Sequence, residues 1–256
     1  MSLVDCNRPR FLQLVVNAAT ASHERFNIGT YKEKTLHLVL KNYFEPDPTL
    51  QEIPLHGFIA DICNSEGITE IQTSGFASMR DKLEAFLPLC KVTVVYPIAK
   101  EKWISWIDPD SGQIGKRNRS PKAGKLFDTV PELVFIHSYL SHPNLTIRAV
   151  LLGIDEYRLL NGKRSRSRKR GSTCFERMPL ELFEIYDFRT PDDYISLLPF
   201  DRESEFTAQE LASCMKYRGR AVSAAVKVLM SVGAIERVGK RGRAYTYRLQ
   251  EASTGL

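Results

Sequence analysis

Helical and strand patterns alternate along the first hundred residues, and this alternation constrains the fold more than any other feature of the sequence. Apolar residues three and four apart predict helices at 10–22, 31–44 and 76–87. Short β-prone runs predict strands at 57–63, 68–73 and 91–98. The run Val92–Tyr96 is apolar except for Thr93, which is typical of a strand buried on both faces. We therefore expect an α/β domain with a sheet flanked by helices.

The rest of the chain predicts a continuation of this domain and a smaller second one. A turn-rich hairpin or loop is expected at 104–126, a helix at 127–140 and a strand at 145–153. Pro191–Pro199 is interpreted as a linker. The expected boundaries are 1–190 for the first domain, with a core at about 28–98, and 191–256 for the second; 256 residues suffice for two domains.

Two acidic residues flank the turn-forming segment Asn64–Gly67. A short turn there pairs 63 with 68 and 62 with 69, so Asp61 lies opposite Glu70. Two carboxylates in directly opposed positions repel each other unless a cation lies between them. Gln72 lies on the same face as Glu70. The pattern therefore predicts a site for a hard divalent ion, Mg²⁺ or Mn²⁺, of the kind that assists phosphodiester hydrolysis.

The order of these elements over residues 28–98 resembles the PD-(D/E)XK nucleases, the restriction-endonuclease-like superfamily. The resemblance implies a mixed sheet flanked by helices, with Asp61 and Glu70 as metal ligands and Glu33 as an accessory carboxylate. Gln72 would stand where that family usually has lysine. Because glutamine carries no charge, Lys82, Lys100 or Lys102 would have to supply the cation, or the site is weakened.

Less specific interpretations of the same residues stay open. Glu33 follows Thr30 by three residues, which also fits a helix-capping box. Asp61 and Glu70 could lie on an exposed hairpin, and His37 is interpreted as a surface or packing residue. The segments IGTYKEKTLH, EIQT and YPIAKEKW additionally resemble a family of uncharacterised bacterial proteins over residues 28–187. That resemblance implies no activity.

Basic residues are concentrated in separate segments of a chain whose net charge is +6. One segment contains Lys116, Arg117, Arg119, Lys122 and Lys125. Another contains Lys163, Arg164, Arg166, Arg168, Lys169 and Arg170, which could equally form a solvated loop. Because clustered cations neutralise backbone phosphates, these segments predict binding to a polyanion.

The last 55 residues, by approximate extent, resemble a winged helix-turn-helix. Thr207 and Glu210 form a capping box, a second helix is expected at 220–232, and a two-stranded ribbon follows with a basic turn. The resemblance implies a second helix that contacts DNA and a ribbon that contacts phosphates. The residues in these roles would be Arg218, Arg220, Ser223 and Lys227 on the helix, and Lys240, Arg241 and Arg243 on the ribbon. A winged helix that mediates protein contacts is the alternative.

Taken together, the sequence predicts a metal-dependent DNA endonuclease that a winged helix delivers to DNA. The alternatives are a non-catalytic DNA-binding regulator or adaptor with a degenerate nuclease domain, and an RNA-binding protein. Five widely spaced cysteines without metal-ligand spacing, and the lack of a signal peptide or membrane span, predict a cytoplasmic protein with no membrane partner. We expect no small-molecule cofactor, and a homodimer stays open.

Overall fold

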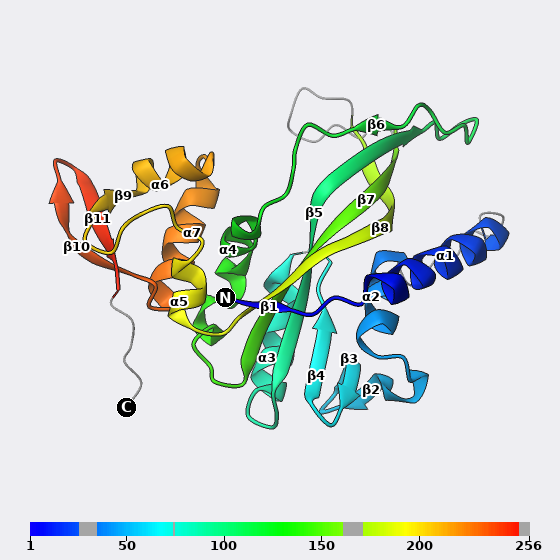
Figure 1. Ribbon diagram of the computed structural model, residues 1–256, viewed down its shortest axis with the longest axis horizontal. Helices are drawn as coiled ribbons and strands as arrows, with labels where there is room; N and C mark the ends of the chain where they lie inside the picture. The colour runs from blue at the N-terminus through cyan, green and yellow to red at the C-terminus, as the bar shows by residue number, and fades with distance from the viewer. Residues whose placement is uncertain (26–34, 74, 161–170, 251–256) are drawn as a thin grey trace.

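A mixed eight-stranded sheet forms the centre of the computed structural model, which describes residues 1–25, 35–73, 75–160 and 171–250 (Figure 1). Its strand order is β1-β8-β7-β5-β4-β3-β2, and β6 pairs with β5. Strand β4 is parallel to β5 and β5 is parallel to β7, whereas the other pairs are antiparallel. The strands are β1 (Ser2–Val4), β2 (Gln51–Leu55), β3 (Phe58–Asn64), β4 (Gly67–Ile71), β5 (Val92–Ile107), β6 (Asn118–Arg119), β7 (Leu145–Leu159) and β8 (Thr173–Phe188).

The helices predicted at 31–44 and 76–87 form with narrower bounds. They are α2 (Thr35–Phe44) and α3 (Met79–Phe86), which bury apolar residues such as Leu36 and Leu83, and α3 is preceded by a 3-10 turn, η2 (Phe76–Ser78). A third helix, α1 (Arg8–Arg25), matches the prediction at 10–22. A 3-10 turn, η1 (Pro48–Leu50), connects α2 to β2. Residues 31–34 of the helix predicted at 31–44 lie outside the described residues.

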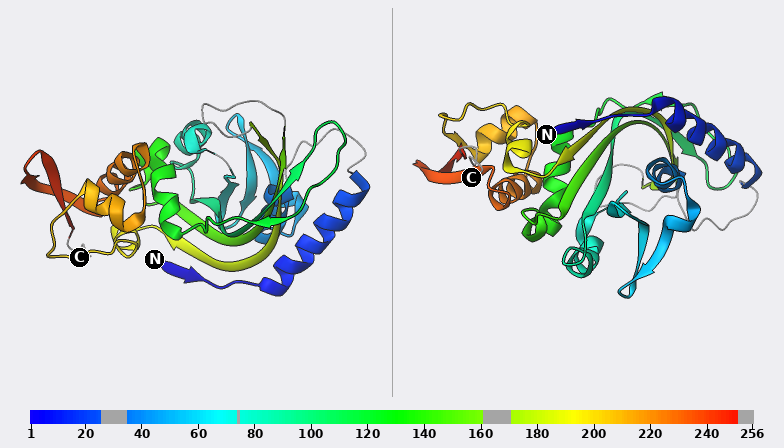
Figure 2. Two further views of the ribbon diagram at one scale, coloured as in Figure 1. Left: turned by 90° about the horizontal axis from the view of Figure 1, so that it is seen from above. Right: turned by 60° about the horizontal axis from the view of Figure 1, so that its bottom comes forward.

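Two hydrophobic clusters cover the two faces of the sheet. Val94 belongs to one cluster and Val95 to the other, as successive strand residues should, so the prediction of a strand buried on both faces is confirmed. Helices α1 and α2 pack in one cluster, and α3 packs in the other. Strands β5, β7 and β8 curve strongly, and α1 lies against their convex side (Figure 2).

Two predicted segments differ from the structure. The loop expected at 104–126 is shorter, because β5 continues to Ile107 and pairs along its length with β7. The helix expected at 127–140 is a broken one. It comprises η3 (Leu126–Asp128), α4 (Thr129–Glu132) and η4 (Leu133–Tyr139), with non-helical backbone at Ile136.

The carboxy-terminal segment folds into helices and a small sheet. It contains β9 (Phe206–Thr207), α6 (Ala208–Met215), α7 (Arg220–Ser231), β10 (Ile235–Arg241) and β11 (Ala244–Leu249), with strand order β10-β11-β9. The capping box of Thr207 and Glu210 is confirmed. So are the second helix and the two-stranded ribbon, whereas β9 was not predicted.

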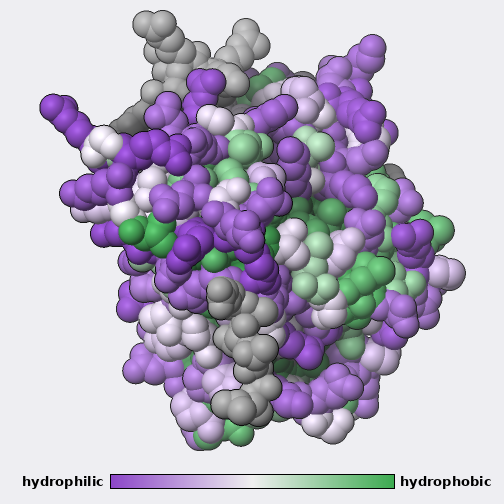
Figure 3. Space-filling view, turned by 60° about the vertical axis from the view of Figure 1, so that its left-hand side comes forward, coloured by the Kyte–Doolittle hydropathy of each residue, from purple (hydrophilic) through white to green (hydrophobic). Residues whose placement is uncertain are grey.

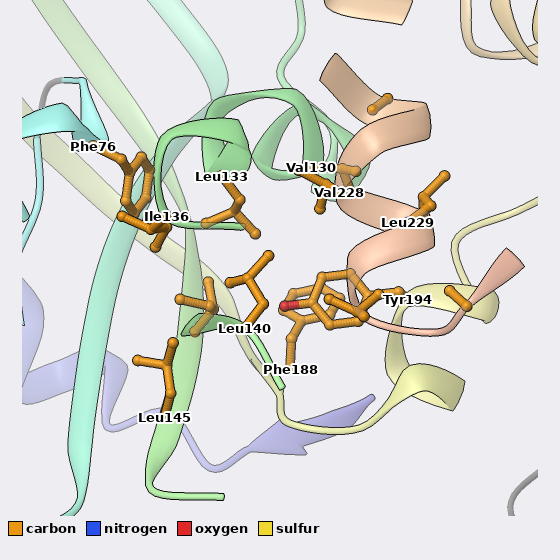
Figure 4. Packing of buried hydrophobic residues seen from close by; sticks show 14 of the residues in the cluster. Phe76, Val130, Leu133, Ile136, Leu140, Leu145, Phe188, Tyr194, Val228 and Leu229 are labelled. Atoms are coloured by element: carbon orange, nitrogen blue, oxygen red, sulfur yellow. The ribbon is translucent and has the colours of Figure 1, made fainter. Parts of the chain in front are cut away.

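The linker predicted at Pro191–Pro199 is wrong. Residues 191–195 form a short helix, α5 (Pro191–Ile195), and Tyr194 is buried in the same cluster as Phe188 of β8. That cluster continues between α4 and α7, where Val130 and Val228 are both fully buried (Figure 4). The carboxy-terminal elements therefore share a hydrophobic core with the large sheet. Among the described residues, no helix combines the length and the apolar character needed to cross a bilayer.

Candidate functional site

The β3–β4 hairpin has the register that the sequence predicted. Ile62 pairs with Thr69, Cys63 with Ile68 and Asn64 with Gly67, which leaves a two-residue turn. The paired residues end there, so the predicted pairing of Asp61 with Glu70 is not part of the ladder. Gly67 has a φ of 123°, and a Cβ there would lie 2.3 Å from the Lys91 carbonyl oxygen, so the close approach of the hairpin to the start of β5 requires glycine.

Asp61 is held by contacts from two other elements. Its Oδ2 accepts a hydrogen bond from the Ile71 backbone N–H at 2.7 Å and lies 3.2 Å from Nε2 of His37 on α2. Burial alone would raise the pKa of Asp61, but the hydrogen bond and charge of His37 and the Ile71 N–H outweigh it and lower the pKa below its ordinary value. Asp61 is therefore an anion at neutral pH.

Glu70 has a different environment. Its side chain is almost fully buried, and its Oε2 lies 2.6 Å from Nζ of Lys82 on α3. Burial and the nearby charge of Asp61 raise the pKa of Glu70 to about 7, although Lys82 opposes that shift. Its second oxygen, Oε1, is buried and has no hydrogen-bond partner among the residues that the structure describes.

The two carboxylates are electrostatic neighbours, but each also has its own basic partner. His37 comes from α2 and Lys82 from α3, and these helices pack in different hydrophobic clusters. Lys82 is fixed further by donating a hydrogen bond to the Ile59 carbonyl at 2.7 Å. Within the described part of the chain, no group of three or more His, Cys, Asp or Glu residues has the arrangement of a metal site. Glu33, the predicted accessory carboxylate, lies outside that part.

Gln72 and the three candidate lysines each have a polar partner in the structure. The Gln72 side-chain amide donates to the Gly75 carbonyl at 2.7 Å, in the turn after β4. Lys100 pairs with Glu184 and Lys102 with Glu156, whereas Lys82 pairs with Glu70. The sequence indicates Lys82 only as one of three candidates and predicts a surface or packing role for His37.

Glu70 gives the protein a specific pH dependence. Because its folded-state pKa of about 7 exceeds its ordinary value of 4.5, its stabilising contribution is complete below about pH 4.5 and is lost as pH rises through about 7. Without divalent ions, the unfolding free energy of the wild type should fall between about pH 5 and pH 8 as Glu70 loses its proton. Glutamine does not titrate, so we expect the fall in Glu70→Gln to be smaller by about 2–3 kcal/mol. Urea unfolding of both proteins in EDTA over this pH range measures the difference. Equal changes in unfolding free energy for the wild type and Glu70→Gln would contradict the prediction.

The predicted DNA-binding residues outside 161–170 are all exposed. Arg117 pairs with Asp155 and lies over the Trp103 ring, and Arg119 pairs with Glu101. On the ribbon, Arg241 pairs with Glu210, and Lys240 lies 5.0 Å from the Tyr245 ring centroid. The remaining exposed residues of this set are Lys116, Arg218, Arg220, Ser223, Lys227 and Arg243. Lys163, Arg164, Arg166, Arg168, Lys169 and Arg170 lie outside the described residues.

The fold and the site define a mixed α/β protein whose β3–β4 hairpin carries two acidic residues, each with its own basic partner. Comparison with known proteins adds a family: residues 34–189 match the family described as a domain of unknown function (DUF8091), and the chain belongs to that family. It is also 31% identical over 224 residues to a Treponema pallidum (strain Nichols) protein described as uncharacterized, covering 86% of this chain and 87% of that one. No solved structure matches the chain.

Proposed function

We propose that this protein is a metal-dependent DNA endonuclease with a restriction-endonuclease-like domain and a carboxy-terminal winged helix. The main support is the buried Glu70 carboxylate, whose pKa is raised in part by the charge of Asp61. Among the described residues, its Oε1 atom has no hydrogen-bond partner. The order α2, β2, β3, β4, α3, β5, with β4 parallel to β5, agrees with the nuclease resemblance.

The residues present fit a divalent ion. A buried carboxylate oxygen without a hydrogen bond carries a desolvation cost that an ion would relieve. Asp61 and the Oε1 atom of Glu70 would hold Mg²⁺ or Mn²⁺, which supplies a polarised phosphoryl oxygen and an acidified water when bound. His37 holds Asp61 in place, and Lys82 supplies the cation that Gln72 cannot.

The carboxy-terminal elements support the DNA-binding part of the proposal. A three-stranded sheet, two helices and a ribbon with Lys240, Arg241 and Arg243 at its exposed tip are the parts that a winged helix uses. Hydrophilic side chains predominate on the face of the molecule that carries these elements (Figure 3). Such basic side chains would contact phosphates and give affinity without sequence preference.

A cleavage assay with the full chain tests the proposal. Linear, nicked, branched and single-stranded DNA are incubated with Mg²⁺, with Mn²⁺ and with EDTA. We expect products with either ion and none with EDTA. DNA binding without cleavage of any substrate would instead support the second candidate, a non-catalytic regulator or adaptor. One observation favours that candidate, because His37 and Lys82 already contact the two carboxylates.

Lys82 gives a second prediction. Lys82→Met removes the cation beside Glu70, and we expect the cleavage rate to fall by about 10- to 100-fold, as when a group that supports a metal ligand is lost. Lys82→Arg keeps the charge and should recover part of the rate. Lys91→Met is the matched control, because Lys91 is exposed and pairs with neither Asp61 nor Glu70. Equal rates for Lys82→Met and wild type would exclude Lys82 from the site.

A further inference from the structure

A groove runs between β5 and the carboxy-terminal elements. Its central cleft has a volume of about 800 Å³ and is lined by Tyr96 of β5, by Lys122 and Lys125 of the following loop, and by Lys216 and Tyr217 after α6. A hollow of about 310 Å³ shares Lys122 with the cleft and reaches Arg119. Another, of about 370 Å³, shares Tyr96 and Tyr217 and reaches Arg220 at the start of α7. We call these three hollows together the groove.

The groove carries cations that form no ion pair among the described residues. Among the described residues, Lys122, Lys125, Lys216 and Arg220 form no ion pair. All four are exposed. An unpaired row of basic side chains in a concave surface attracts a polyanion.

Of the three acidic residues that line the central cleft, Glu156 and Asp128 have polar contacts within the protein. Glu156 is buried, and it contacts Arg158, Lys102 at 3.5 Å and Arg177 at 3.6 Å. Asp128 accepts hydrogen bonds from the Tyr217 hydroxyl and from the Lys125 backbone N–H. Glu132 is the remaining acidic residue that lines the cleft. The central cleft therefore keeps a positive excess, whereas Asp128 and Glu132 outnumber Arg220 in the hollow that reaches α7.

The size and the aromatic residues of the groove favour a single strand over a duplex. A cleft of about 800 Å³ encloses a ligand of drug size, comparable with one or two nucleotides. Tyr96 and Tyr217 line the junction of the cleft with the next hollow, where Phe135 is 52% exposed. Aromatic rings beside a basic groove are the combination that binds unpaired bases and their phosphates.

The groove also reaches the end of β4. Its central cleft is lined by Thr73 and Gly75, which follow β4, and by Leu36, the neighbour of His37. Asp61, Glu70 and Gln72 do not line it. Arg177 ties this end of β4 to β8 by donating to the Thr73 carbonyl at 3.0 Å. A strand in the groove would thus pass the end of β4, the strand that carries Glu70.

We propose that the groove binds a single strand of DNA, with Lys122 and Lys216 contacting its phosphates and Tyr217 stacking on a base. The choice of DNA rests on the proposed function, whereas binding itself does not need cleavage. A strand in the groove would present its backbone to the β3–β4 hairpin, and duplex DNA would be held by the exposed ribbon and α7.

Fluorescence anisotropy in EDTA tests this without cleavage. The probes are labelled oligothymidine of about 15 nucleotides and a labelled duplex of equal length. We expect Lys122→Glu and Lys216→Glu each to weaken oligothymidine binding about tenfold and to change duplex binding less than threefold. Each should also reduce the salt slope of log K by about 0.7, the value for one lost phosphate contact on a single strand. Lys91→Glu, an exposed lysine at the other end of β5, is the matched control and should bind both probes as wild type does.

Tyr217 supplies an independent readout. Tyr217→Phe keeps the ring and should keep oligothymidine binding, whereas Tyr217→Leu should weaken it about tenfold. Melting curves check that each variant is folded. Wild-type binding by both lysine variants, equal losses on the two probes, or tighter binding of RNA of matched sequence would overturn the proposal. Groove binding without cleavage would refute only the endonuclease, and cleavage with unchanged single-strand binding in the lysine variants would refute only the groove.

Discussion

Replacing Asp61 with asparagine, or Glu70 with glutamine, is expected to lower the rate of Mg²⁺-dependent DNA cleavage by at least about 100-fold. Each change keeps the size of the side chain but removes a charge that would hold the ion. A bound ion stabilises a phosphoryl transition state by several kcal/mol, and each 1.36 kcal/mol corresponds to a factor of ten in rate. Binding to DNA should be unchanged, because neither side chain is exposed and neither lines the groove.

Glu66→Gln is the control for both variants. Glu66 is an exposed carboxylate in the turn of the same hairpin, so the variant changes the same charge without touching the site. We expect it to cleave at the wild-type rate. The measurement is the initial rate at saturating Mg²⁺, with gel-shift binding in EDTA as the parallel readout. Wild-type rates for Asp61→Asn and Glu70→Gln would end the catalytic interpretation of the hairpin.

The sequence was most informative where local patterns decide the structure. The stripe of Leu83 and its helical neighbours, and the turn at Ser65–Glu66, each follow from contacts between residues close in the chain. The pairing of Cys63 with Ile68 and of Ile62 with Thr69 could therefore be predicted. Local patterns were misleading at Pro191–Pro199, where the prolines suggested a linker. The partners that bury Tyr194 are distant in sequence, and only the tertiary fold reveals them.

The candidate site also combines local features, which the sequence predicts, with contacts between residues distant in sequence, which it does not. Its two carboxylates could be predicted, because they lie on one hairpin. Their partners could not, since Lys82 reaches Glu70 from a helix twelve residues further along the chain and His37 reaches Asp61 from one twenty-four residues earlier. Spacing alone offered Lys82, Lys100 and Lys102 on equal terms. The packing of α3 against the sheet decides among them, because it brings Lys82 to Glu70 while the other two pair with β7 and β8.

Leu133→Ala is expected to lower the free energy of unfolding by about 2–5 kcal/mol, the usual cost of a cavity at a fully buried leucine. Leu133 is completely buried in the cluster that joins the sheet to α7, as Figure 4 shows. Because this cluster is shared, we expect one cooperative transition. The two tryptophans, Trp103 and Trp106, lie in β5 and report on the sheet, whereas far-UV circular dichroism also reports on α6 and α7.

The two signals should therefore shift together in urea. Leu12→Ala is the control, since Leu12 is 56% exposed and its loss should change stability by no more than about 0.5 kcal/mol. A circular dichroism transition that separates from the tryptophan transition in Leu133→Ala would show that the carboxy-terminal elements unfold by themselves. Coincident transitions would instead mean that Lys216 and Tyr217 are held against β5 by the same core that holds the sheet. The width of the groove would then be fixed by that core, with no need for a ligand to bring its two walls together.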